Sequence, residues 1–153
     1  PISSAAICIS LGLSGLAAGA ACAGCSAQMI GFAFMSFREN GIGGLISQGL
    51  GTSMLQIPNI WKNWRIWIPP TAASMITGPI STCLLKMTNN AAGAGMGTSG
   101  LVGQFNAVAV MGASSLPSIA LVHFILPALL TVLIAIPMRK KGWIGEGDLK
   151  LPD

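Results

Sequence analysis

Long apolar runs alternate with short polar breaks along the chain, and the longest runs have the length of a membrane crossing. Residues 1–37 contain no charged side chain, a stretch longer than the roughly 20 apolar residues that span a bilayer. Residues 66–86 and 117–137 are each about 21 residues, or ~31 Å as helix, which matches a hydrocarbon core of ~30 Å. The pattern therefore predicts crossings at 66–86 and 117–137, and one long or two short crossings within 2–37.

Two further apolar segments, residues 41–57 and 88–112, are interrupted by glycine and polar residues. Neither has the uninterrupted length of a crossing, so we expect both to be irregular. Nearly the same phrase occurs in each: GLGTSML at 49–55 and GMGTSGL at 95–101. A repeated Gly-Thr-Ser phrase in two irregular apolar segments suggests a shared structural role, although glycine, serine and threonine are common enough here for coincidence.

The composition indicates a membrane protein. Charged residues make up 8% of the chain and hydrophobic residues 52%, whereas an ordinary soluble domain is about 25% charged. The net charge of +4 would also suit nucleic acid, but the cations lie at the ends of apolar segments, as membrane topology predicts. We therefore expect the lipid bilayer as the surroundings and no nucleic acid as a partner.

Small residues mark a helix contact in the first apolar run. Gly15-x-x-x-Gly19 and a four-residue ladder place small side chains on one helical face, a pattern typical of close packing between membrane helices. The ladder consists of Ser10, Ser14, Ala18, Cys22 and Ser26.

Positive charges orient the segments. Arg139–Lys141 follow the last apolar run, and Lys62 and Arg65 stand among three tryptophans before the 66–86 run. Because Lys and Arg favour the cytoplasmic side, both clusters should lie inside, with two crossings between them. Residues 88–112 then enter and leave from the outer face, and residues 41–57 dip in from the cytoplasmic face.

The predicted fold class is an all-α integral membrane protein, a multi-pass helical bundle with two re-entrant Gly-rich segments. We expect a membrane domain at 1–138 and a short cytoplasmic tail at 139–153. The chain begins at Pro1 without a methionine or a basic leader, so we expect it to be the C-terminal part of a longer protein.

Inverted segments of broken backbone are typical of secondary transporters, where they line a cavity near the bilayer midplane. Their hydroxyls and free amides can bind a polar solute. The candidate residues in the repeated phrases are Thr52, Ser53, Thr98 and Ser99.

Five further polar side chains are candidates for solute binding: Glu39, Asn40, Asn89, Asn90 and His123. Glu39 follows Arg38 in the phrase FRENG, which lies either at membrane depth or in a cytoplasmic loop. Asparagine amides both donate and accept, as recognition of sugar hydroxyls requires. His123 either contacts solute or relays a proton, or it is a neutral side chain bonded to a neighbouring helix.

Other chemistries find little support in the sequence. Cys22-x-x-Cys25 has no second pair of ligands and fits a packing face, so we expect no metal site. The glycine-rich stretch at 88–100 lacks the Gly-Lys-Ser/Thr ending of a phosphate-binding loop. No nucleophile and base can be paired, so we expect neither catalytic residues nor a cofactor in this chain.

Three stretches carry a family resemblance: SFRENGIGGLISQGLGTSMLQIPNIWKN, then RIWIPP, then NNAAGAGMGTSGLVGQ. They resemble the EIIC-type membrane subunit of bacterial phosphotransferase sugar systems, in particular the branch labelled as toxin-gene regulators. The resemblance covers roughly residues 1–137 and is most specific from Gly49 to Asn59 and in GMGTSGLVGQ.

The resemblance implies a bacterial plasma-membrane permease for a sugar or polyol-like solute, with a cytoplasmic EIIB-type subunit as phosphoryl donor and a homodimer as a further partner. Such subunits are usually around twice as long as this chain. The alternative is a membrane sensor or regulator that keeps the transporter fold without transport. From the sequence we expect Asn90→Ala and Thr98→Ala to impair uptake.

Overall fold

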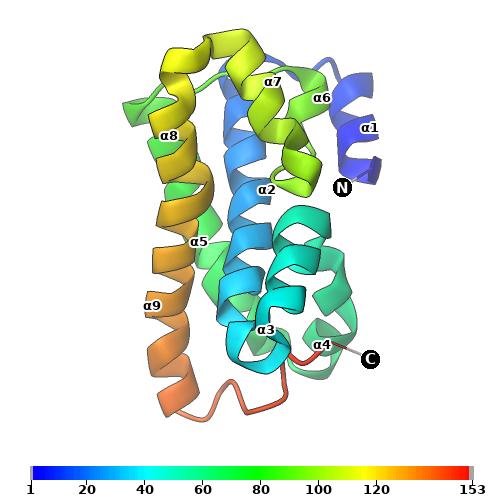
Figure 1. Ribbon diagram of the computed structural model, residues 1–153, viewed down its shortest axis with the longest axis vertical. Coiled ribbons are helices and arrows are strands. Elements are labelled where there is room, and N and C mark those ends of the chain that lie inside the picture. The colour runs from blue at the N-terminus through cyan, green and yellow to red at the C-terminus, as the bar shows by residue number, and fades with distance from the viewer. Residues whose placement is uncertain (1, 152–153) are drawn as a thin grey trace.

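Three long helical segments lie side by side along the long axis of the molecule (Figure 1). The computed structural model describes residues 2–151, and helices of several kinds make up most of them, without a named strand in this range. The long segments are α2 (Gly15–Met35), α5 (Ile68–Pro79) with the π-helical turn η4 (Ile80–Leu84), and α8 (Leu116–Ala120) with η7 (Leu121–Ile125) and α9 (Leu126–Lys140).

Two short helical hairpins fill the space beside this bundle. The lower hairpin, residues 37–62, consists of α3 (Phe37–Ile46), the π turn η1 (Ser47–Gly51), the 3-10 turn η2 (Ser53–Gln56) and α4 (Ile57–Lys62). In Figure 1 it rises from the end of α2 to about half the height of the molecule and returns.

The upper hairpin, residues 91–111, descends from the opposite end of the molecule and turns back at about the same height (Figure 1). Its elements are α6 (Ala91–Ala94), the 3-10 turn η5 (Ser99–Leu101) and α7 (Val102–Met111). The N-terminal helix α1 (Ile2–Ser10) packs beside α6. The short turns η3 (Trp64–Trp67) and η6 (Ala113–Ser115) lead into the two later long segments.

By length and composition, two helices in the described range can cross a membrane: Gly15–Met35 and Ala113–Lys140. The second contains the predicted crossing at 117–137. The predicted 66–86 segment is built as η3, α5 and η4, with Pro69 and Pro70 in the first turn of α5, where the missing N–H groups cost nothing. The chain changes from α to π geometry directly after Pro79, a residue that cannot donate a backbone hydrogen bond within the helix.

The first apolar run forms two helices because the chain breaks between Ser10 and Gly15. Gly12 has φ +61° and Gly15 has φ +67°, a left-handed conformation that favours glycine. The predicted small-residue ladder is therefore wrong as a single helical face, since Ser10 ends α1 and Ser14 precedes α2. Its later members Ala18, Cys22 and Ser26 do lie fully buried on α2.

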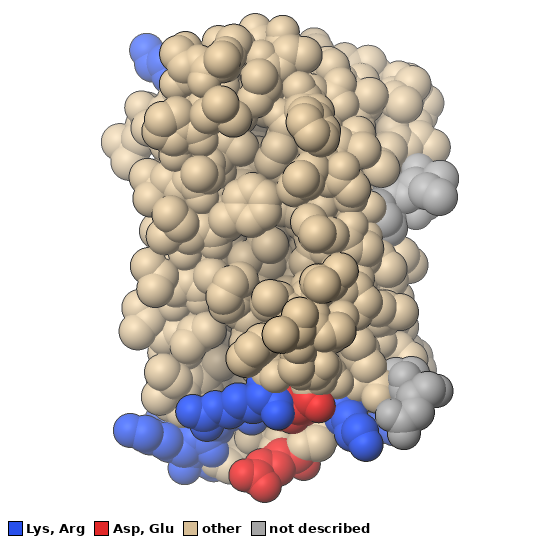
Figure 2. All heavy atoms as spheres, in the orientation of Figure 1, with Lys and Arg blue, Asp and Glu red and all other residues tan. Residues whose placement is uncertain are grey.

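Most charged side chains gather at one end of the molecule, below a broad uncharged band, and a basic side chain lies at the opposite end (Figure 2). The predicted cationic clusters share this end, because the guanidinium of Arg65 lies 5.5 Å from the ring centroid of Trp143, just after Arg139–Lys141. Trp61 and Trp64 are 90% and 64% exposed here, as suits tryptophan at headgroup level.

The segment after α9 folds back against this charged end. Ile144 and Leu149 are buried and join a core cluster with Phe32, Met35 and Ile66. Within the expected 139–153 tail, residues 152–153 lie outside the described range, as does Pro1. The described part of the tail is packed structure, which its polar sequence had not suggested.

Candidate binding site at the hairpin tips

The tips of the two hairpins touch, and the two copies of the repeated phrase make the contact. Thr98 in the upper tip donates a hydrogen bond of 2.5 Å from its hydroxyl to the carbonyl oxygen of Gly49 in η1. Thr98 is completely buried. A buried hydroxyl bonded to a carbonyl from the opposite hairpin fixes the two tips relative to one another.

Glycine lets the upper tip approach its neighbours closely. A Cβ at Gly97 would lie 2.9 Å from the backbone of Cys25 on α2, and one at Gly95 would lie 2.5 Å from the backbone of Ala5 on α1. Real Cβ atoms do not come so near, so only glycine fits at these positions. Gly97 also has φ +55°, where an L-residue is strained.

The corresponding glycines of the lower tip are under less constraint. Gly51 matches Gly97 in the repeated phrase, yet a Cβ at Gly51 would meet nothing within 4 Å. At Gly49 an added Cβ would make an ordinary contact of 3.5 Å with Ala33. The two copies therefore share a place at the hairpin tips but differ in how tightly their backbones are enclosed.

A cavity of about 300 Å³ opens where the two tips meet α1 and α2. Small-molecule sites typically measure roughly 300–1,000 Å³, so this cavity suits a solute of the size of one small ring. Its lining residues are Ser4, Cys25, Gln28, Met29, Thr52, Ser53, Met54, Gly95 and Met96.

Hydroxyl and amide groups give the cavity its polar chemistry. Thr52 and Ser53 contribute hydroxyls, and the hydroxyl oxygen of Thr52 accepts a hydrogen bond of 3.1 Å from the backbone N–H of Met54. That hydroxyl can still donate its own proton. Gln28 adds an amide whose nitrogen donates to the hydroxyl of Thr71 on α5 at 3.2 Å. Such groups both donate and accept, which matches the hydroxyls of a neutral polyol.

Thr52 and Ser53 are thus the predicted site residues that line the cavity. Thr98 lies behind it as the link between the tips, and Ser99 is half-buried in η5, outside the lining set. Glu39, Asn40, Asn89, Asn90 and His123 also lie outside the lining set.

Glu39 and Asn40 lie at the charged end, where they hold the folded-back tail. Glu39 pairs with Arg139 at 2.9 Å, and its second oxygen accepts from the backbone N–H of Leu149 at 2.8 Å. Asn40 donates to the carbonyl of Leu149 and accepts from the N–H of Leu151, each at 2.8 Å. Both side chains therefore form hydrogen bonds to the backbone of the tail.

Asn89 and Asn90 organise the base of the upper hairpin. Asn89 donates to the carbonyl of Gly103 at 3.0 Å, and Asn90 caps α6 by accepting from the N–H of Gly93 at 2.9 Å. The side-chain nitrogen of Asn90 donates to Asn106 at 2.7 Å. These amides make their bonds within the fold.

His123 is buried in the π turn η7, and its Nδ1 lies 2.9 Å from the side-chain nitrogen of Gln104 on α7. The same nitrogen donates to the hydroxyl of Ser26 on α2 at 3.3 Å. Of the alternatives left open by the sequence, a bond between His123 and a neighbouring helix is the one observed.

Several amide side chains were not among the predicted functional residues. Gln28 stands among small and apolar residues of a predicted crossing, and that placement is a signal that could have identified it. Gln48, Gln56 and Asn59 form a buried chain with Ser36 through bonds of 2.8–2.9 Å. Gln56 and Asn59 also donate to the tail carbonyls of Leu149 and Lys150, a contact across about ninety residues that no local pattern reveals.

Cysteines and potential metal ligands are dispersed. Cys8, Cys22, Cys25 and Cys83 are all free thiols. Residues 2–151 contain no cluster of three or more His, Cys, Asp and Glu side chains able to hold a metal ion.

The family model described as "Phosphotransferase system, EIIC" matches residues 1–151. The chain belongs to this EIIC family. A search of curated proteins and a search of solved structures each found no match.

Membership of the EIIC family supports a permease-type role in a phosphotransferase system. EIIC domains are the membrane components of such systems. This agrees with the two helices able to cross a membrane and with the uncharged band above the charged end (Figure 2).

Proposed function

We propose that this EIIC chain translocates a sugar or sugar-like solute, which a cytoplasmic EIIB-type subunit phosphorylates on arrival. The family match supports the system and the permease role. The observation that carries the proposed site is the cavity of about 300 Å³ bounded by the tips of both hairpins.

The proposed topology follows from the hairpins and the charges. α2, α5 with η4, and α8–α9 cross the membrane, while the two hairpins enter from opposite faces and turn back inside it. Irregular backbone at membrane depth is tolerated where it lines a cavity or is buried in protein. In the proposed topology, the hydroxyl of Thr98 provides the hydrogen-bond donor for the carbonyl of Gly49 at that depth. The charged end, including the tail, faces the cytoplasm under the positive-inside rule.

Within the cavity, Thr52, Ser53 and Gln28 hydrogen-bond the solute. Their hydroxyl and amide groups provide donors and acceptors without a fixed charge, as a neutral sugar requires. Thr98 holds the two tips at the right separation, and Asn89 and Asn90 hold the upper hairpin in place. Solute specificity is then a property of the tips, whereas Glu39 and Asn40 act at the cytoplasmic end.

Uptake and binding by variants of the cavity test this proposal. Ser53→Ala and Gln28→Leu should lower the uptake of the accepted sugar about tenfold or more, because each leaves solute hydroxyls without partners. The sugar is first selected by a thermal-shift screen of monosaccharides and polyols on the purified protein. Membrane expression and unfolding temperature should stay close to those of the unsubstituted protein.

Ser47→Ala is the matched control for Ser53→Ala. Ser47 lies in the same hairpin, but its hydroxyl donates to the carbonyl of Gly43 one turn earlier and does not line the cavity. Normal uptake in both cavity variants would defeat the site assignment. Binding without any flux in proteoliposomes containing the donor subunit would favour the sensor alternative.

A further inference from the structure

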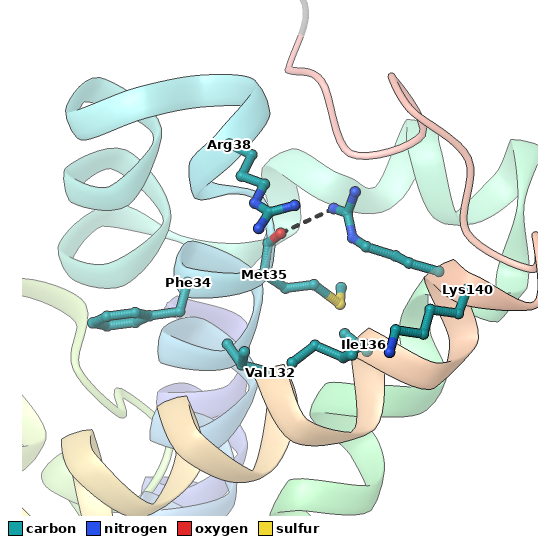
Figure 3. A pocket seen from close by; sticks show the side chains of 8 residues that line it. Phe34, Met35, Arg38, Val132, Ile136 and Lys140 are labelled. Atoms are coloured by element: carbon teal, nitrogen blue, oxygen red, sulfur yellow. Dashed lines mark hydrogen bonds between the residues drawn. The ribbon is translucent and has the colours of Figure 1, made fainter.

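A second cavity, of about 370 Å³, lies between the charged ends of α2 and α9 and shares no lining residue with the cavity at the hairpin tips. Figure 3 shows Met35 on α2 facing Val132 and Ile136 on α9, while the ring of Phe34, also a lining residue, extends to the outer side of α2. Phe34 and Ile136 are each 45% exposed, so the apolar walls open to the side of the bundle. This side is the surface that faces lipid in the proposed topology.

Cations surround the charged end of this cavity. Arg38 from α3 and Lys140 from the end of α9 line it from opposite sides (Figure 3), together with Arg139. Arg139 is engaged by Glu39 at 2.9 Å and by the carbonyl of Met35 at 3.1 Å. Three cations and one neighbouring carboxylate leave the rim with a net positive charge, carried by Arg38 and Lys140.

An apolar groove that ends in uncompensated cations is complementary to an anionic amphiphile. An apolar side chain of a partner protein would fill the walls without using the charge, whereas a free phosphate would use the charge without covering the walls. The exposed tryptophans at the same end mark the headgroup level. At that level the cytoplasmic leaflet presents an anionic headgroup above an acyl chain.

We propose that this cavity binds an anionic phospholipid. The headgroup phosphate contacts Arg38 and Lys140, and one acyl chain lies along Phe34, Val132 and Ile136. The bound lipid bridges α2, α3 and α9, and thereby clamps the base of the lower hairpin. The inference goes beyond solute transport, and it rests on the membrane topology proposed above.

The test uses the purified protein in detergent, with phosphatidylglycerol, phosphatidylcholine or inorganic phosphate added at equal concentrations. Native mass spectrometry counts retained lipid, and thermal unfolding measures stabilisation. Phosphatidylglycerol should be retained and should raise the unfolding temperature, while phosphatidylcholine and inorganic phosphate should have little effect. Equal effects of the two lipids, or the same shift with inorganic phosphate alone, would overturn the proposal.

Charge-removing variants locate the headgroup. Arg38→Gln combined with Lys140→Gln should weaken phosphatidylglycerol binding about fivefold for each cation removed, at low salt. Lys62→Gln combined with Lys150→Gln is the matched control, since it removes the same charge from exposed positions at the same end, outside the cavity. Equal weakening in both pairs would mean non-specific attraction and would contradict a site.

A cavity-filling variant locates the acyl chain. Ile136→Trp should occupy the groove and abolish retention of phosphatidylglycerol, while Leu133→Trp, on an exposed part of α9 outside the cavity, should not. If Ile136→Trp instead abolishes a dimer that forms without added lipid, the groove holds a second copy of the chain and the lipid proposal is wrong.

Discussion

The hydroxyl of Thr98 and the carbonyl oxygen of Gly49 lie 2.5 Å apart, although the two residues belong to hairpins that start from opposite ends of the molecule. The bond joins the two copies of the Gly-Thr-Ser phrase. The two copies contribute differently: the upper copy supplies the tightly enclosed Gly97 and the donor hydroxyl of Thr98, and the lower copy supplies the acceptor carbonyl of Gly49.

Removing this hydroxyl should destabilise the fold. Thr98→Val keeps the shape of the side chain but leaves the Gly49 carbonyl buried without its donor, which costs about 1–3 kcal/mol. Unfolding in mixed micelles measures the free energy change. Thr82→Val is the control, because the hydroxyl of Thr82 bonds to carbonyls of its own helical turn and to the neighbouring thiol of Cys83, and not to another hairpin. An equal loss in both variants would contradict the role of the tip contact.

Alanine should be tolerated in one copy of the phrase and not in the other. Gly97→Ala combines a strained φ of +55° with a Cβ 2.9 Å from the backbone of Cys25, and should cost at least about 2 kcal/mol. Gly51→Ala, at the matching position, meets open space and should be nearly neutral. Comparing the expression and unfolding temperature of the two variants checks this, and equal damage would show that the described asymmetry is wrong.

The tail should loosen when Asn40 is shortened. Asn40→Ala removes two hydrogen bonds to the backbone of Leu149 and Leu151. Amide hydrogen exchange at Leu151 should accelerate about fivefold or more, at roughly 1 kcal/mol for its lost bond, whereas the N–H of Leu149 keeps its bond to Glu39. Ser115→Ala, which alters an exposed local bond far along the chain, should leave that exchange unchanged. Unaltered tail exchange in Asn40→Ala would mean that other contacts hold the tail.

His123 and Gln104 should be energetically coupled. A double-mutant cycle with His123→Leu and Gln104→Leu isolates their interaction, and polar pairs between membrane helices average about 0.6 kcal/mol, with a maximum near 1.7. We expect coupling in the upper part of that range because His123 is 1% exposed and Gln104 is 7% exposed. Strictly additive effects would argue against the bond.

Hydropathy predicted much of the architecture. The apolar run at 117–137 lies inside the helix Ala113–Lys140, and the glycine-rich segments 41–57 and 88–112 are irregular as expected. These features follow from composition over whole helical turns, which is local information. Two segments within residues 2–37 were one of the alternatives, but the position of the break at Gly12 was not predicted, because its neighbours are as apolar as those within a crossing helix.

The candidate site was only partly predictable. Thr52 and Ser53 were recognised through the repeated phrase, but the cavity they line also depends on α1 and α2, whose approach is set by tertiary packing. Asn89 and Asn90 looked like ligands because amides are versatile, and that same versatility lets them cap α6 and bond Gly103. Sequence alone does not tell which partner an amide will find.

The central claim is that the two hairpin tips meet inside the membrane, and a measured distance between the tips tests it most directly. Spin labels on Gly51→Cys and Ser99→Cys, in a cysteine-free background reconstituted in nanodiscs, report whether both tips meet inside the bilayer. Because Gly49 and Thr98 are in contact and consecutive Cα atoms lie about 3.8 Å apart, the account predicts labelled backbones within about 20 Å. A distance of ~30 Å or more, the thickness of the hydrocarbon core, would place the tips at opposite faces and contradict it.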